Sequence, residues 1–205
     1  MHSSETPDRP SRRGIVTGVA WSVPVIAFSV ATPAKAASQF VCPAVPANAS
    51  WTAATTGTGN NAPNSWSGTG AARAFTFFQD SNSASNTFQY RLSAPLSVVA
   101  GRTYRISYAI QNQYGCSGSA TTVNTNFDGF VAGQRIGGRS SQPGNANTLQ
   151  TPGPCGGGFG AVQTISVDYA ATTTGTIQLQ MRFTTAATTG GNGDDYRITP
   201  SIVCL

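Results

Sequence analysis

The chain has 205 residues, of which 39% are hydrophobic and only 9% are charged, against about 25% charged residues in an average domain. Thr, Ser, Asn, Gln, Gly and Ala replace the missing charges, a mixture that favours strands and tight turns over helices. The formal net charge of +5 falls to +3 after position 36, where eight arginines and five aspartates are scattered. No basic run is present, which argues against nucleic acid as a partner.

The first 36 residues are arranged like an export signal. Ser11-Arg12-Arg13 precede an apolar run over 15–31, and small residues lead to an expected cut after Ala36. This order resembles a twin-arginine (Tat) signal peptide, which implies export to the bacterial cell envelope or the medium. An uncleaved membrane anchor is the alternative, although Pro24 and the interspersed polar residues suit a spanning helix poorly. No later segment is long or apolar enough to span a bilayer.

All four cysteines follow the signal, and an even number in an oxidising compartment predicts two disulfides. Three pairings can be drawn. We favour Cys42–Cys204, which joins the chain ends, and Cys116–Cys155, which ties two glycine-rich loops. Metal binding is the weaker interpretation, because no pair has Cys-x-x-Cys spacing and no histidine follows the signal.

Alternation of apolar and polar residues predicts the strands in chain order. Residues 37–71 are interpreted as a short strand at 40–42 and a loop-like lead-in. Asp128-Gly129 is predicted to form a hairpin turn, a Gly/Pro/Asn-rich excursion follows over 137–160, and Pro200 suggests an edge or a bulge. The clear strands are predicted at 72–79, 87–92, 104–111, 121–127, 130–134, 165–169, 177–183 and 196–202.

About eight strands with one apolar face each, and no helical periodicity, predict an all-β fold: one two-sheet antiparallel β-sandwich over residues 37–205. Three segments then resemble the jelly rolls of carbohydrate-binding modules: Leu96–Tyr108, Phe127–Gly133 and Asp194–Ile198. The resemblance spans roughly residues 75–203. It implies a jelly-roll sandwich that recognises a glycan.

The residues after the signal include no His, Glu or Lys. This excludes Ser-His-Asp and Cys-His catalysis and a zinc site with imidazole ligands. A glycosidase needs two carboxyls that flank its substrate, and only five aspartates are present. We therefore expect a protein that is not an enzyme and needs no cofactor.

Two groups of side chains are candidates for binding a polysaccharide or cell-surface glycan. One would form hydrogen bonds with sugar hydroxyls from outward positions on strands, and the other would stack on pyranose rings. The alternative is that they have no ligand: Gln and Arg are common on a solvated sheet face, and loop tryptophans often close the end of a sandwich. The first group is Arg105, Gln111, Gln178, Gln180 and Arg182, and the second is Trp51, Trp66 and Tyr114.

Asn192, Asp194 and Asp195 place hard oxygens at close spacing. Similar jelly rolls hold a structural calcium ion near the last strand, so calcium is a candidate ligand here. A polar hairpin turn is the plainer interpretation of the same residues.

Two functions from different classes remain open. The first is a secreted glycan-binding module. The second is a structural or adhesive cell-envelope protein with no small ligand. An open face that carries aromatic side chains would favour the first, whereas a covered face or a long bare edge strand would favour the second.

Overall fold

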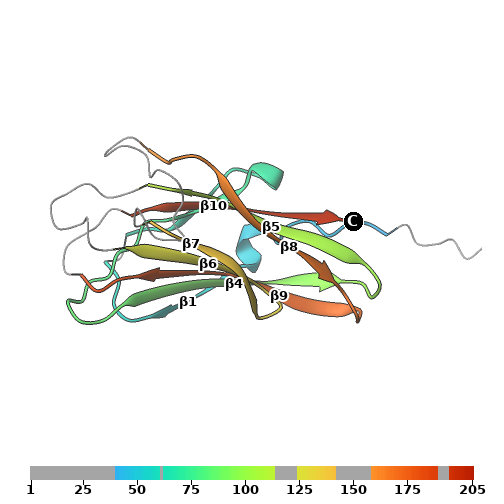
Figure 1. The fold of residues 1–205 in the computed structure, drawn as a ribbon, viewed down its shortest axis with the longest axis horizontal. Coiled ribbons are helices and arrows are strands. Elements are labelled where there is room, and N and C mark those ends of the chain that lie inside the picture. The colour runs from blue at the N-terminus through green and yellow to red at the C-terminus, as the bar shows by residue number, and fades with distance from the viewer. Residues whose placement is uncertain (1–39, 61, 114–123, 142–157, 189–193) are drawn as a thin grey trace, which may run out of the picture. The chain divides into compact units, whose positions relative to one another are not determined.

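The computed structural model describes residues 40–60, 62–113, 124–141, 158–188 and 194–205. Within these ranges the protein is all-β, with ten strands and two short 3₁₀ turns, η1 (Asn48–Ser50) and η2 (Gly70–Ala72). The strands form two antiparallel sheets of five strands each, which Figure 1 shows as two layers. The predicted two-sheet β-sandwich is confirmed. No helix in the described ranges has the length and hydropathy to cross a bilayer.

Each layer is named here after its central strand. The β9 sheet has the order β1–β4–β9–β6–β7, and the β10 sheet has the order β2–β3–β10–β5–β8. The strands of the β9 sheet are β1 (Thr52–Thr56), β4 (Phe88–Val98), β9 (Gly175–Thr185), β6 (Thr125–Val131) and β7 (Gln134–Ser140). Those of the β10 sheet are β2 (Ser65–Ser67), β3 (Ala74–Phe77), β10 (Tyr196–Cys204), β5 (Thr103–Asn112) and β8 (Gln163–Ala170).

The core lies between the sheets and is rich in aromatic rings. Phe183 of β9 stacks on Phe77 of β3 with ring centroids 4.4 Å apart, and Phe127 of β6 lies 5.3 Å from Phe183. All three rings are fully buried, and each contributes about 2–3 kcal/mol through lost contact with water. The Tyr196 hydroxyl donates to the Thr125 carbonyl at 2.8 Å. Burial raises the pKa of that phenol, so it stays neutral in the core.

The predicted turn at Asp128-Gly129 is wrong. Strand β6 runs through both residues, and the hairpin to β7 turns at Ala132-Gly133, where both φ angles are positive (50° and 80°). Gly129 faces inward, because a Cβ there would lie 2.7 Å from the Tyr108 ring. The ladder to β7 shifts register just after it, between Gly129 and Phe130. Gly129 thus makes room for the Tyr108 ring in the core and does not form a turn.

Within the described residues, ten strands form where about eight were predicted, and the strand expected at 87–92 continues to Val98 as β4. Other boundaries differ as well. No strand forms at residues 40–42, whereas β1 and β2 form inside the expected lead-in, and β7 occupies the start of the expected excursion. Residues 142–157 of that excursion lie outside the described part of the chain. Strand β10 pairs with β3 only over Tyr196–Ile198, so Pro200, which has no N–H, lies where β10 is paired on one side.

The Cys42–Cys204 disulfide is confirmed, with Cα atoms 5.8 Å apart and 162 residues of separation. It ties the segment before β1 to the end of β10. Cys116 and Cys155 lie outside the described residues, as does the whole predicted signal over residues 1–36.

Candidate functional site

The five predicted hydrogen-bonding side chains fall on two opposite surfaces. Inward positions alternate along each strand, so Arg105 and Gln111 of β5 lie on the outer face of the β10 sheet. Gln178, Gln180 and Arg182 of β9 lie on the outer face of the β9 sheet. The structure therefore brings three of the five together and separates them from the other two by the thickness of the sandwich.

The outer face of the β10 sheet uses its polar groups internally. Arg105 forms a two-bonded ion pair with Asp168 on β8, with both N–O distances 2.8 Å. This pairing lowers the pKa of Asp168 and raises the pKa of Arg105. At the far end of the strand, Gln111 Nε2 donates to the Gly160 carbonyl at 3.0 Å. Both side chains predicted to bind a ligand on this face therefore have partners within the protein.

Described residues also cover part of this face. The Arg197 guanidinium of β10 lies 4.5 Å from the centre of the Phe159 ring. Phe159 directly precedes Gly160, whose carbonyl accepts the hydrogen bond from Gln111. The end of the glycine-rich excursion therefore lies on the β10 sheet at the Gln111 end.

The two predicted stacking tryptophans pack against the protein itself. Trp51 is 7% exposed, and its Nε1 donates to the Pro46 carbonyl at 3.2 Å. Its ring lies 5.5 Å from Trp66, which in turn lies 5.3 Å from Phe75. The pair thus extends the aromatic core into the lead-in segment. Tyr114, the third predicted ring, lies outside the described residues.

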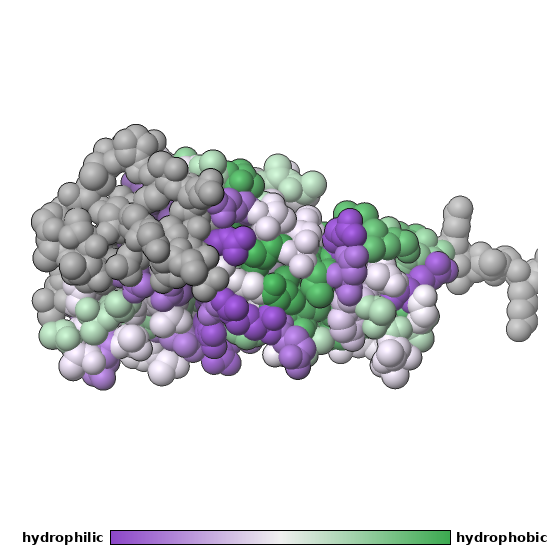
Figure 2. All heavy atoms as spheres, in the orientation of Figure 1, coloured by the Kyte–Doolittle hydropathy of each residue, from purple (hydrophilic) through white to green (hydrophobic). Residues whose placement is uncertain are grey.

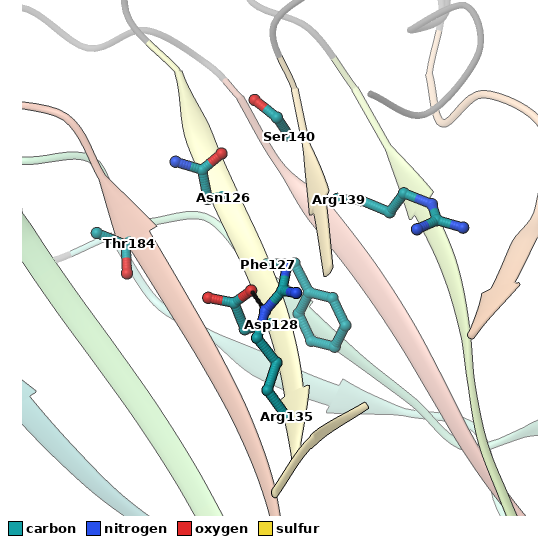
Figure 3. Close-up of a pocket in the computed structure, with 7 residues that line it drawn as sticks. All are labelled: Asn126, Phe127, Asp128, Arg135, Arg139, Ser140 and Thr184. Carbon is teal, nitrogen blue, oxygen red and sulfur yellow. Dashed lines mark hydrogen bonds and ion pairs between the residues drawn. The ribbon is translucent and has the colours of Figure 1, made fainter. Parts of the chain in front are cut away.

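The outer face of the β9 sheet carries its polar side chains in rows across the strands. Arg91 of β4, Arg182 of β9 and Asp128 of β6 are direct cross-strand neighbours. In this row the Asp128 carboxylate accepts hydrogen bonds from two arginines: Arg135 of β7 at 2.6 Å and Arg182 at 2.8 Å. Asp128 on β6 therefore links the side chains of its two neighbouring strands, β7 and β9. Figure 3 draws its ion pair with Arg135.

The next row brings an aromatic ring to the surface. Ser93, Gln180 and Phe130 are cross-strand neighbours, and Gln180 Nε2 donates to Ser93 Oγ at 3.2 Å. The Phe130 ring is partly exposed, and the Arg182 guanidinium lies 4.7 Å from its centre. Phe130 was not predicted as a site residue, because the turn expected at Asp128-Gly129 places it at the start of another strand. Alternation through Asn126, Asp128 and Phe130 was the signal that could have found it.

A pocket of about 300 Å³ lies next to these rows, at the lower end of the volumes seen for ligand sites. Figure 3 shows Asn126 and Asp128 on β6 beside Thr184 of the neighbouring strand, whereas Arg139 extends away from Asp128. The residues that line the pocket are Asn126, Phe127, Asp128, Arg135, Arg139, Ser140 and Thr184. Asp128 is the one carboxylate in this set, and both its oxygens are paired, so the described lining lacks the two carboxyls of a glycosidase.

The calcium prediction concerns a different place. Asp194 is buried and its carboxylate accepts from Ser141 Oγ at 2.5 Å, while Asp80, also buried, accepts from Asn60 Nδ2 at 3.2 Å. Burial, followed by the charges of Asp80 and Asp194, raises the pKa of Asp195 to about 7. The described residues contain no group of three acidic, His or Cys side chains able to hold a metal ion. Asn192 is outside them, so calcium stays a prediction.

The chain carries few charges, with eight arginines and five aspartates after position 36. Figure 2 shows one face of the molecule, on which hydrophilic, weakly polar and hydrophobic residues lie side by side in separate groups.

Comparisons with known proteins give likeness of fold at low sequence identity. No protein-family model and no curated protein sequence matches the chain. Among solved structures, the chain is similar to TmCBM61 in complex with β-1,4-galactotriose, with a TM-score of 0.41 and 15% identity over 76% of this chain and 88% of that one.

Two further structures illustrate the range of similar folds. The first is described as carbohydrate-binding modules from the β-sandwich superfamily, with a TM-score of 0.41 and 14% identity over 78% of this chain and 58% of that one. The second is a cyclase from Fischerella sp. TAU, with a TM-score of 0.37 and 11% identity over 80% of each chain. Function has to be argued from the residues of the site itself.

Proposed function

We propose that this protein is a secreted, non-catalytic module that binds a glycan on the outer face of the β9 sheet. The observation that carries the proposal is the partly exposed Phe130 ring beside Gln180 and Arg182, next to a pocket of about 300 Å³. An aromatic ring offers a flat apolar surface to the C–H groups of a pyranose, and planar amide and guanidinium groups form hydrogen bonds with its hydroxyls.

The strand order supports the jelly-roll form of the sandwich. Strands β3 to β10 pair as nested partners, β3 with β10, β4 with β9, β5 with β8 and β6 with β7. This is the order in which one long hairpin wraps into a jelly roll. Export through the Tat route is part of the proposal and rests on the sequence of residues 1–36 alone.

The test is a glycan array, followed by pull-down on insoluble polysaccharides, with the purified oxidised protein. Phe130→Ala should weaken binding to any glycan that the protein retains by about tenfold, because an aromatic contact is worth about 1–1.5 kcal/mol. Ser166→Ala, an exposed change on the other sheet, is the matched control and should leave binding unchanged. A folded protein that retains no glycan would contradict the proposal.

One observation favours the alternative, a structural or adhesive envelope protein. All five residues of the edge strand β1 are exposed, and within the described residues β1 pairs only with β4. Although β1 is only five residues long, it carries no charged residue or proline that would block pairing, so this edge can accept a strand from another chain. Under this alternative the protein would self-associate in sedimentation experiments, and Ala54→Lys on that edge would abolish the association.

A further inference from the structure

The outer face of the β9 sheet carries an excess of positive charge. Its central row holds Arg91, Arg182 and Asp128, and Arg135 reaches the same carboxylate from β7. This surface therefore holds three guanidinium groups and one carboxylate, which leaves two positive charges in a chain with few charges of any kind. The β10 sheet differs, because Arg105 and Asp168 neutralise each other on its outer face.

Arg91 is the group that leaves this charge unbalanced. It is exposed and lies directly opposite Arg182 in the β4–β9 ladder. Like charges directly opposite one another destabilise a sheet. The Asp128 carboxylate bonds to Arg135 and Arg182, and no hydrogen bond or ion pair of Arg91 is present among the described residues.

A second, independent observation is that one donor of Arg182 has no hydrogen-bond acceptor in the described part of the chain. Its Nη2 donates to Asp128, but its Nε is buried and has no hydrogen-bond partner in the described structure. Leaving a buried donor unpaired is costly, and the cost is larger for a charged group. An anionic oxygen placed between Arg91 and Arg182 would screen the two arginines from each other, and it would pair with the Nε donor once a shift of the Arg182 side chain exposes that atom.

We propose that the ligand of this face is an acidic polysaccharide, whose carboxylate or sulfate group is bound between Arg91 and Arg182 while the adjoining sugar ring lies on Phe130. This inference rests on the proposed glycan-binding function and specifies its ligand. The ligand is in either case a sugar that bears an anionic oxygen group. This group is a carboxylate in uronates and a sulfate in sulfate esters.

The test compares charged polymers with neutral counterparts of the same backbone. Calorimetric titration would use polygalacturonate against its fully methyl-esterified form, and dextran sulfate against dextran. We expect at least tenfold tighter binding of one charged polymer than of its counterpart, and the polymer that is bound identifies carboxylate or sulfate. Raising the salt concentration should weaken this preference, because the charges are near the surface.

Arg91→Gln should weaken binding of the charged polymer about three- to tenfold. This exposed side chain contributes to no described contact, so the variant should fold normally. Arg197→Gln is the matched control, since it removes the same charge from an exposed position on the outer face of the other sheet. It should leave binding unchanged.

Each of the other outcomes would overturn the ligand, the site or the function that we propose. Equal binding of charged and neutral polymers would overturn the acidic-ligand inference and leave the glycan-binding function standing. Equal losses in Arg91→Gln and Arg197→Gln would overturn the site, because total charge alone would then explain the binding. Binding of none of the four polymers, and of no glycan on an array, by a folded protein would overturn both proposals.

Discussion

At the scale of single residues, the absence of a side chain at Gly138 shapes the pocket. Gly138 is buried opposite Asp128 in the β6–β7 ladder. A Cβ at this position would collide with the Asp128 carboxylate and the Arg135 guanidinium, and would lie 2.6 Å from the Phe127 carbonyl oxygen. The ion pair between Asp128 and Arg135 therefore requires glycine here.

Gly138→Ala should destabilise the protein by about 1–3 kcal/mol, because the backbone carbonyl cannot move as freely as a flexible side chain. It should also weaken glycan binding by displacing Arg135. Thermal denaturation and the binding assay measure the two effects. Gly175→Ala is the control: this residue is in β9 of the same sheet, and a Cβ there meets no atom within 4 Å. Equal melting temperatures for the two variants would contradict the prediction.

Asp195 gives a pH-dependent prediction at the same scale. Its pKa in the folded protein is about 7, raised first by burial and then by Asp80 and Asp194, against about 3.9 in an unfolded chain. The folded state therefore holds the proton more tightly, so the stability from this group is full below about pH 4 and is lost as the pH rises to 7.

Asp195→Asn should remove that loss. In buffer with a chelator, the variant should gain stability over the native protein as the pH rises from 4 to 8, by on the order of 1–2 kcal/mol after allowance for solvent screening. Parallel melting curves across this range would refute the assignment. Adding calcium at pH 7.5 tests the calcium prediction in the same experiment: a rise in the melting temperature of the native protein alone would support it.

At the scale of elements, the hairpin between β6 and β7 shows why the turn was misplaced. Asp128-Gly129 has the composition of a tight turn, yet the chain turns at Ala132-Gly133. Ala132 has φ = 50°, a left-handed conformation that alanine adopts at a cost of about 1–2 kcal/mol. Local turn preference therefore favours Asp128-Gly129. The packing of Gly129 against Tyr108 keeps that pair in strand β6, and the chain turns at Ala132-Gly133 instead.

Ala132→Asn should stabilise the protein, because Asn-Gly suits a two-residue hairpin turn with two positive φ angles. The expected gain is about 0.5–1 kcal/mol, or roughly 1–4 °C in melting temperature for a chain of this size. Ala132→Val is the opposing control and should lower the melting temperature, since a branched side chain resists positive φ. A lower melting temperature for Ala132→Asn would show that the turn tolerates alanine without strain.

The strands differ in how well alternation predicted them. β5 and β9 alternate between inward, mostly apolar residues and outward, mostly polar ones, and the strands predicted at 104–111 and 177–183 lie within them. β1 (Thr52–Thr56) is exposed on both faces, so its sequence has no alternation to detect. A strand that buries nothing leaves no hydrophobic pattern, and only its pairing with β4 defines it.

At the scale of the whole molecule, alternation predicted which side chains point outward but not which sheet they share. Arg105 and Arg182 have the same pattern in the sequence, yet they lie on opposite surfaces. The assignment depends on strand order, which joins residues as far apart as Arg91 and Arg182. Such pairing is set by tertiary packing, so the composition of the β9 face, with Phe130 and Arg91, emerged only from the fold.

The disulfides are also a property of the whole chain, and their stabilising effect can be tested. Cys42–Cys204 closes a loop of 162 residues, whereas the predicted Cys116–Cys155 bond would close one of 39. If restriction of the unfolded chain is the main effect, the longer loop should stabilise the fold by about 1 kcal/mol more.

The double variant Cys42→Ser/Cys204→Ser should therefore unfold at a lower denaturant concentration than Cys116→Ser/Cys155→Ser. Thiol counting on the denatured native protein decides whether the second bond exists, since two disulfides leave no free thiol and one leaves two. If the second bond forms and its loss destabilises the protein more than loss of the first, loop length is not what sets the stability. The disulfides would then stabilise through contacts in the folded state rather than through restriction of the unfolded chain.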